Sequence, residues 1–250
     1  MKTNVECEMW NVELTSRRQF QTPNSKFQIA VLGSGSKGNC YAFSDGKATV
    51  QLECGLPIAK TLAMLNWQLP DAILVTHEHC DHGRYAEKFL ERGVEIYMTA
   101  GTAQALKIKR HNLHLIKPNE IFDVCGHQVT ALEVKHDAAE PVNFIVDDTL
   151  FITDVGEIPE VKGNFRRVLI EANYDIASLL GADINDRQKR RIRENHLSIK
   201  QTCDFLKTID EPDEVRLIHI SSRHGDGADF VERVKRVTNF RNVFAAEVTL

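Results

Sequence analysis

The most concentrated set of metal-ligating side chains in the sequence is the string His77-Glu78-His79-Cys80-Asp81-His82. It directly follows residues 72–75, which have the apolar composition of a buried strand. In an irregular loop at a strand end, His77 and His79 can converge on one ion, while Asp81 and His82 turn toward a second. Neutral imidazole and carboxylate are suitable ligands for Zn²⁺ and similar divalent ions. A solvated histidine-rich loop is the alternative, but so dense a cluster after an apolar strand favours a metal site.

Residues 187–193 form the densest basic run in a chain whose formal net charge is -4. On a helix, these cations can align a phosphodiester backbone through contacts that do not depend on base sequence. A solvated, charged helix face is the usual alternative, but the run lies immediately before His196, which favours phosphate binding. The candidate substrate contacts are Lys189, Arg190, Arg191 and Arg193.

Residues 33–38 satisfy the pattern G-x-G-x-x-G, and Glu53 is an acid further along the chain. A dinucleotide site requires a helix to begin inside such a loop, so that the helix N-terminus faces the pyrophosphate. Here the loop leads into residues 39–43, which are strand-like. The sequence therefore predicts a tight hairpin turn and no nucleotide site.

Short strand-like runs alternate with helical patterns through both halves of the chain. Strands are predicted over residues 27–32, 40–43, 48–52, 72–75, 94–98, 128–134, 142–146, 150–153, 167–170 and 215–220. Helices are predicted over about 58–66, 85–91, 102–107 and 186–194, and from residues 176, 198 and 226. Ser198 and Gln201 have the spacing of a capping box. This mixture predicts an α/β sandwich and not a doubly wound sheet.

The chain of 250 residues is 42% hydrophobic and 26% charged, as in an ordinary globular protein of one or two domains. Residues 1–26 are polar and mixed and are interpreted as an N-terminal extension, and residues 27–250 as the main domain. No apolar run approaches the roughly 20 residues of a membrane span, and no secretory signal follows Lys2. Six scattered cysteines predict reduced thiols. We therefore expect a cytoplasmic protein that is not bound to a membrane.

The histidine string is similar to the signature of the metallo-β-lactamase fold superfamily. In that superfamily a later histidine, an aspartate and a final histidine each follow a strand, and His136, Asp154 and His219 match these positions. Taken singly, His136 or His219 is more often structural, but together and in this order they resemble ligands. The ligand set that the resemblance implies is His77, His79 and His136 for one ion, Asp81, His82 and His219 for the second, and Asp154 bridging both. It also implies a four-layer αββα sandwich of two mixed sheets flanked by helices.

Within the superfamily the chain most resembles the WalJ/YycJ-like branch. The matching segments are residues 33–39, 140–144, 171–175 and 190–198, so the resemblance extends from about residue 27 to the end. Glu53 stands where the superfamily usually has aspartate, and we expect its carboxylate, one methylene longer, to support the metal ligands. Tyr174 stands where branch members often have histidine.

The implied site fits a hydrolase. Two divalent ions roughly 3.5–4 Å apart can hold a hydroxide between them and clamp the attacked group. No cysteine nucleophile is then needed, and Cys54 and Cys80 are interpreted as small buried thiols. Asp81 is counted as catalytic as well as a ligand. His196 is the candidate proton donor to a departing alkoxide, with helix capping or a surface position as the alternative. Glu171 is expected to orient His196 or a ligand, unless it is an ordinary strand-end carboxylate.

Three functions are carried forward. The first is a metal-dependent phosphodiesterase, an exonuclease-like nuclease acting on DNA in preference to RNA, as the branch resemblance implies. The second is a hydrolase of a small ester, such as a cyclic nucleotide or a thioester. The third is a non-catalytic nucleic-acid-binding module, which an intact ligand set disfavours. The expected cofactors are two Zn²⁺ or Mn²⁺ ions per chain, with Fe²⁺ as a further candidate, and a homodimer is compatible with the sequence.

Overall fold

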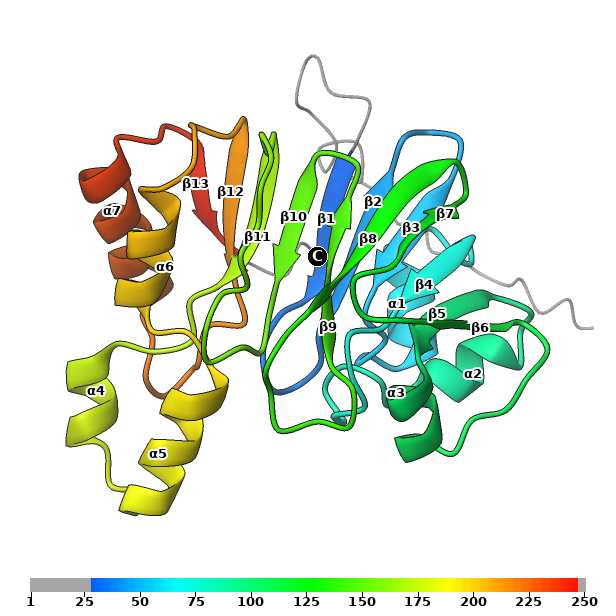
Figure 1. Ribbon diagram of the computed structural model, residues 1–250, viewed down its shortest axis with the longest axis horizontal. Helices are drawn as coiled ribbons and strands as arrows, with labels where there is room; N and C mark the ends of the chain where they lie inside the picture. Colours follow the sequence, from blue (N-terminus) through cyan, green and yellow to red (C-terminus); the bar gives the residue numbers. More distant parts are fainter. Residues whose placement is uncertain (1–27, 247–250) are drawn as a thin grey trace, which may run out of the picture.

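Two β-sheets pack face to face in the computed structural model, with helices against their outer faces (Figure 1). The structure describes residues 28–246, so the predicted N-terminal extension lies outside the described residues. The first sheet, in the order β1-β2-β3-β4-β5-β6, consists of β1 (Gln28–Gly33), β2 (Cys40–Ser44), β3 (Thr49–Leu52), β4 (Ala72–Leu74), β5 (Glu95–Thr99) and β6 (Leu113–Ile116). The second, in the order β13-β12-β11-β10-β9-β8-β7, consists of β7 (Ile121–Val124), β8 (His127–Glu133), β9 (Val142–Val146), β10 (Thr149–Ile152), β11 (Arg167–Glu171), β12 (Glu214–Ile218) and β13 (Val243–Ala245).

Both sheets are mixed. In the first sheet, β1, β2 and β3 are antiparallel, and β3 to β6 are parallel. In the second sheet, β7 to β10 are antiparallel, and β10 to β13 are parallel. Parallel strands end at the same edge of a sheet, so the loops that follow β4, β10 and β12 can all contribute side chains to one site.

Seven helices among the described residues complete the layers. They are α1 (Ile58–Met64), α2 (Ala86–Leu90), α3 (Ala100–Ala105), α4 (Ile176–Gly181), α5 (Asp186–Asn195), α6 (Ile199–Leu206) and α7 (Gly227–Thr238). Helices α1, α2 and α3 lie on the side of the first sheet, and α6 and α7 cover the second. The pair α4 and α5 projects beyond the ends of the strands (Figure 1).

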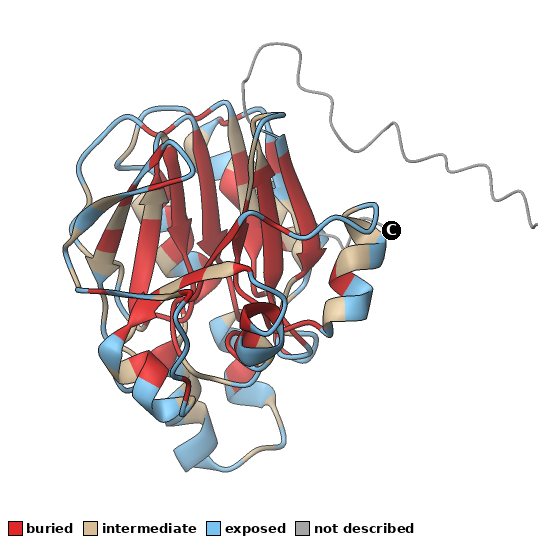
Figure 2. Cartoon of the chain, turned by 90° about the vertical axis from the view of Figure 1, so that its right-hand side faces the viewer, coloured by how far each residue is buried: buried red, intermediate tan, exposed pale blue. Residues whose placement is uncertain are grey.

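The alternation of side chains along each strand places the core. On β11, Leu169 belongs to the cluster between the two sheets, whereas Val168 and Ile170 belong to the cluster beneath α6 and α7. On β4, Leu74 faces the other sheet, and Ile73 packs with the α2 side of the molecule. This period of two is what a sheet covered on both faces requires. Figure 2 shows the result, with buried residues concentrated in the strands and exposed ones on the outer helix faces.

The predicted sandwich of two mixed sheets flanked by helices is confirmed. The predicted strands and helices are present with small shifts at their ends; α3, for example, begins at Ala100 and not at residue 102. Strands β6, β7 and β13 were not predicted. Among the described residues, no helix is long and apolar enough to cross a membrane.

The glycine-rich loop is a strand-to-strand turn, as predicted. Residues 33–39 connect the antiparallel strands β1 and β2, and no helix begins there. A Cβ at Gly33 would lie 2.6 Å from the carbonyl oxygen of Gly38, so the close approach of the two backbones requires glycine.

Capped helices fix the segment that carries His196. The side chain of Asn185 accepts a hydrogen bond from the backbone N–H of Gln188 in a capping box at the start of α5. The predicted capping box of Ser198 and Gln201 is present at the start of α6. His196 is the C-cap residue of α5, so a helix end on either side holds it in place.

Candidate metal centre

The predicted ligands lie at one edge of the two sheets, each just after a strand. The string from His77 to His82 follows β4, His136 follows β8, Asp154 follows β10, and His219 follows β12. Asp154 (φ 48°) and His219 (φ 51°) have left-handed backbone conformations, which residues other than glycine rarely adopt. Strained backbone of this kind is concentrated at functional sites, where the surrounding structure enforces it.

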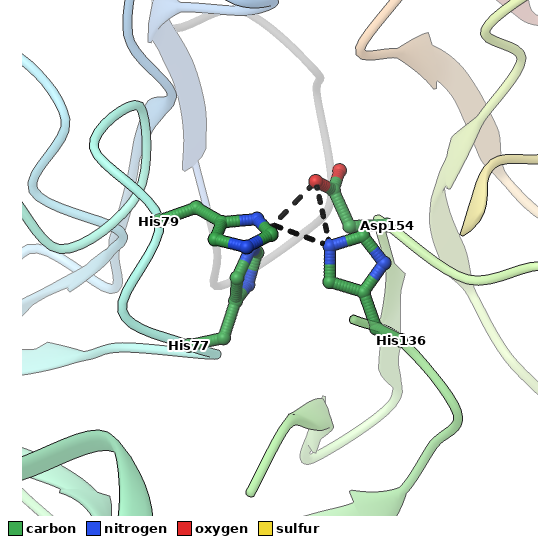
Figure 3. A group of neighbouring side chains, drawn as sticks. All are labelled: His77, His79, His136 and Asp154. Atoms are coloured by element: carbon green, nitrogen blue, oxygen red, sulfur yellow. Dashed lines mark hydrogen bonds and ion pairs between the residues drawn. The ribbon is translucent and has the colours of Figure 1, made fainter. Parts of the chain in front are cut away.

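The first ligand group is His77, His79, His136 and Asp154, whose candidate ligand atoms all lie within 4.8 Å of one another. In Figure 3 these side chains point toward one another. The Nδ1 atom of His79 is 3.2 Å from Nε2 of His136. The Oδ2 atom of Asp154 is 3.7 Å from Nε2 of His77 and 3.6 Å from Nε2 of His136.

The second group, Asp81, His82 and His219, adjoins the first through Asp154. The Oδ2 atom of Asp81 is 3.5 Å from Nε2 of His82 and 3.3 Å from Nε2 of His219. The Oδ2 atom of Asp154 is 3.3 Å from Nε2 of His82, and its Oδ1 atom is 3.0 Å from Nδ1 of His219. The structure thus brings together the residues of the implied ligand set, and a further group of Asp154, Glu171, His196 and His219 overlaps with both.

The donor atoms fit divalent cations. The Nε2 atom of His77 is buried and has no hydrogen-bond partner. The ring nitrogens of His79 and His136 face each other at 3.2 Å, where they can share only one proton. A cation shared by these nitrogens and the Asp154 carboxylate would satisfy all of them at once.

The acidic side chains and histidines of the site shift one another's pKa values. Burial opposes the charged form of His219, but Asp154, Asp81 and Glu171 together raise its pKa to about 10. Burial likewise opposes ionisation of Asp154, yet His219 and His82 hold the pKa of its carboxyl well below the usual range. Because imidazole binds a metal only in its neutral form, an arriving cation takes the place of the proton on such a ring.

Glu53 lies beside His82 of the second group. Its carboxylate is fully buried, with Oε1 at 3.4 Å from Nδ1 of His82. The Oε2 atom accepts a hydrogen bond from the backbone N–H of Thr76 at 3.3 Å. This approach is at the ring edge opposite Nε2, and neither Oε1 of Glu53 nor Nδ1 of His82 has a hydrogen-bond partner among the described residues.

Three supporting residues were not predicted. The Asn39 amide donates to Oδ2 of Asp81 at 3.3 Å and lies 3.0 Å from Nε2 of His82. Ser34 accepts a hydrogen bond from the backbone N–H of His219, and Asn173 donates to the His219 carbonyl. All three lie within the segments 33–39 and 171–175 that carry the branch resemblance. The resemblance of these two segments to the branch was the feature of the sequence from which the three residues could have been predicted.

Glu171 connects His196 to the metal centre. Its fully buried Oε1 atom accepts from Nδ1 of His196 at 2.7 Å and from Nδ1 of His219 at 2.9 Å. Burial opposes the charge of His196, but Glu171 raises the pKa of the ring. The Nε2 atom of His196 makes no hydrogen bond to any described residue, and the ring lines the hollow above the metal centre. Glu171 therefore contacts both a ligand and the candidate proton donor.

The hollow above the two ligand groups, the metal hollow, has a volume of about 590 Å³. Its lining includes the predicted residues His79, Asp81, His136, Asp154, Arg191, His196 and His219. Lys37, Arg223 and His224 also line it and were not predicted. His224 lacked any motif in its surroundings that could have identified it.

The four basic residues predicted to contact the substrate, Lys189, Arg190, Arg191 and Arg193, lie in different surroundings. Arg191 lines the metal hollow, and its Nε donates to Oδ2 of Asp137 at 2.7 Å. The ammonium of Lys189 donates to the carbonyl of Leu180 at the end of α4. Arg190 and Arg193 line a separate hollow on α5. Of the four candidate substrate contacts, only Arg191 lines the metal hollow.

The five cysteines of the described residues form no disulfide bond. Cys54 is buried near the site as expected. Cys80 is exposed, so the prediction of a buried thiol is wrong there. Its side chain points outward from a loop whose neighbouring residues turn toward the metal centre.

A family profile described as "Beta-lactamase superfamily domain" matches residues 57–220, more than half of the chain. The chain belongs to this family. "Exodeoxyribonuclease WalJ" of Streptococcus pneumoniae is 29% identical over 226 residues, covering 79% of this chain and 83% of the relative. "Exodeoxyribonuclease YycJ" of Bacillus anthracis is 26% identical over 219 residues, covering 77% and 82%.

The metallo-beta-lactamase fold protein YhfI from Bacillus subtilis has a similar structure, with a TM-score of 0.69 at 16% identity, covering 89% of this chain and 97% of that one. The predicted family, its WalJ/YycJ-like branch and its fold are thereby confirmed. The protein is a metal-dependent hydrolase.

Proposed function

We propose that this hydrolase cleaves phosphodiester bonds in DNA, in the manner of an exonuclease, with two divalent metal ions per chain. The observation that carries this proposal is the contact between the two ligand groups, with Asp154 of the first at 3.3 Å from His82 and 3.0 Å from His219 of the second, in a hollow that Arg191 also lines. The names of the two curated relatives, both exodeoxyribonucleases, support DNA as the substrate.

In this proposal His77, His79 and His136 would hold one ion, Asp81, His82 and His219 would hold the other, and Asp154 would contribute to both. The orphaned Nε2 atom of His77 and the facing nitrogens of His79 and His136 support the assignment. Zn²⁺ and Mn²⁺ suit nitrogen and carboxylate donors, with Fe²⁺ as a further candidate. When bound, such ions lower the pKa of water and polarise a phosphoryl oxygen.

His196 supplies the proton that the departing alkoxide needs. Its Nδ1–H donates to Glu171, so the tautomer is fixed and Nε2 is left to act in the metal hollow. The carboxylate of Glu171 favours the protonated ring, which is the form that can donate. His196 is therefore assigned as general acid, and Glu171 as the residue that positions it.

Positive side chains at the rim of the metal hollow suit a phosphate backbone. Lys37, Arg191 and Arg223 line the hollow and come from three different segments of the chain. Contacts of this kind neutralise phosphates without reading bases. They support a polymer substrate over a neutral ester.

The test uses purified protein with Mn²⁺ or Zn²⁺ on single-stranded and duplex DNA, RNA, cyclic nucleotides and a chromogenic phosphodiester. We expect DNA to be degraded from its ends, with an affinity that falls steeply with salt. His79→Ala should abolish turnover and leave DNA binding largely intact, while His111→Ala, an exposed histidine outside the site, should behave as wild type. Activity on cyclic nucleotides or thioesters alone would assign the site to a small ester and refute the proposal.

A further inference from the structure

A second hollow lies on helix α5, apart from the metal hollow. It has a volume of about 570 Å³, and Arg190, Arg193, Tyr174 and Lys200 are among the residues that line it. We refer to it as the arginine hollow. Arg190 and Arg193 are one helical turn apart and therefore lie on the same face of α5.

The two arginines are free to bind a ligand. Neither guanidinium makes a hydrogen bond or an ion pair with any described residue, although Arg191 between them is paired with Asp137. Three other polar side chains of the hollow are engaged: Ser198 and Gln201 bond each other in the α6 capping box, and Lys200 is paired with Asp204. Among the lining residues, Glu194 is the only carboxylate. The available donors are thus two planar cations, which match the oxygens of a phosphate.

The two hollows are related through α5. Arg191 faces the metal hollow and its neighbour Arg190 the arginine hollow, because successive residues point about 100° apart around a helix axis. No lining residue is common to the two hollows, so they are separate sites beside the same helix. One phosphate cannot contact both, but a strand with several phosphates can cross α5 and occupy them together.

We propose that the arginine hollow binds a backbone phosphate of the same DNA strand whose scissile phosphodiester lies in the metal hollow. The hollow is then a second phosphate subsite, and the enzyme prefers strands long enough to reach it. This inference rests on the proposed function. A dinucleotide without terminal phosphates contains one phosphodiester, so it can fill the metal hollow but has nothing left for the second subsite.

The experiment measures kcat/KM on single-stranded oligodeoxynucleotides from the dinucleotide upward, together with a chromogenic phosphodiester. For wild type we expect kcat/KM to rise with length and then level off. The double variant Arg190→Ala/Arg193→Ala should lose this rise, by about tenfold on long strands, and keep wild-type rates on the dinucleotide and the chromogenic ester. On long strands, the slope of log(kcat/KM) against log salt concentration should become shallower by about 0.7, the contribution of one neutralised phosphate on a single strand.

Arg187→Ala is the matched control, an exposed arginine of the same helix that lines neither hollow, and it should keep the rise with length. The inference is wrong if wild type shows no dependence on length, or if the double variant keeps it. A failure of the proposed function looks different: wild type then cleaves the chromogenic ester and no DNA of any length.

Discussion

Glu53 is the residue at which this chain departs from its superfamily at the metal centre. Its carboxylate lies against Nδ1 of His82 and accepts the N–H of Thr76 in a fully buried position. In Glu53→Gln one oxygen can still accept from Thr76, but the new amide N–H faces His82, whose Nδ1 carries a proton when Nε2 holds a metal. We therefore expect metal affinity to fall about 10- to 100-fold, measured by competition with a chelating dye.

Glu157→Gln is the control for this change, because it removes the charge of an exposed glutamate outside the site. It should leave metal affinity unchanged. Equal affinity of the Glu53 and Glu157 variants would mean that Glu53 serves the fold and not the ligands.

The loss of kcat on replacing His196 is predicted to be larger for substrates with a poorer leaving group. His196→Ala should lower kcat on DNA about 10²- to 10⁴-fold, because an alkoxide leaves only with a proton. A nitrophenyl ester releases nitrophenolate, which leaves without a proton, so kcat on this substrate should fall far less. Glu171 keeps donors from His219 and Leu197 in this variant, so the buried carboxylate is not left unpaired. Steady-state rates on both substrates decide the matter, and an equal loss on both would indicate a structural role for His196.

At the scale of the elements, the basic side chains of α5 lie in different surroundings and are expected to have different roles. Arg191→Ala should raise the KM for DNA about tenfold, the effect of one charge-assisted phosphate contact. The Arg191 side chain is 67% exposed, so its pair with Asp137 contributes little stability, under about 1 kcal/mol. Lys189→Ala removes a charge from the same helix but not from the metal hollow, and should leave KM unchanged. If both variants raise KM equally, the charge of the helix matters and not the position of Arg191.

The three strands that the sequence did not predict share one property: β6, β7 and β13 are all edge strands. A central strand is covered on both faces and contains a run of apolar residues, such as the fully buried β11. An edge strand has a neighbouring strand on one side only, and fewer of its residues need to be apolar. In β7 only Val124 is buried, and in β13 only Val243, which leaves too little pattern to detect.

For the whole molecule, the metal centre joins the two sheets. His77, His79, Asp81 and His82 follow a strand of the first sheet, whereas His136, Asp154 and His219 follow strands of the second. Ions held by both sets bind the folded state alone and stabilise it, by about 2.7 kcal/mol at a free concentration 100 times the Kd. Chelation should therefore lower the urea midpoint of wild type, and added Mn²⁺ or Zn²⁺ should restore it. In His79→Ala/His136→Ala the midpoint should respond much less to metal. A wild-type midpoint that is the same with and without metal contradicts this expectation.

The family and the two-sheet sandwich could be predicted from the sequence alone, and so could the set of donors that the structure brings together. This was possible because each donor lies just after a buried strand, and the apolar strand and the donor type are both local features of the chain. Only the tertiary structure decided that Glu171 contacts both His196 and His219, residues 25 and 48 positions away. Only the structure showed that Arg191 lines a different hollow from Arg190 and Arg193. It also showed that Asn39 donates a hydrogen bond to Asp81. Contacts of this kind depend on strand register and helix orientation, which result from the packing of the whole chain.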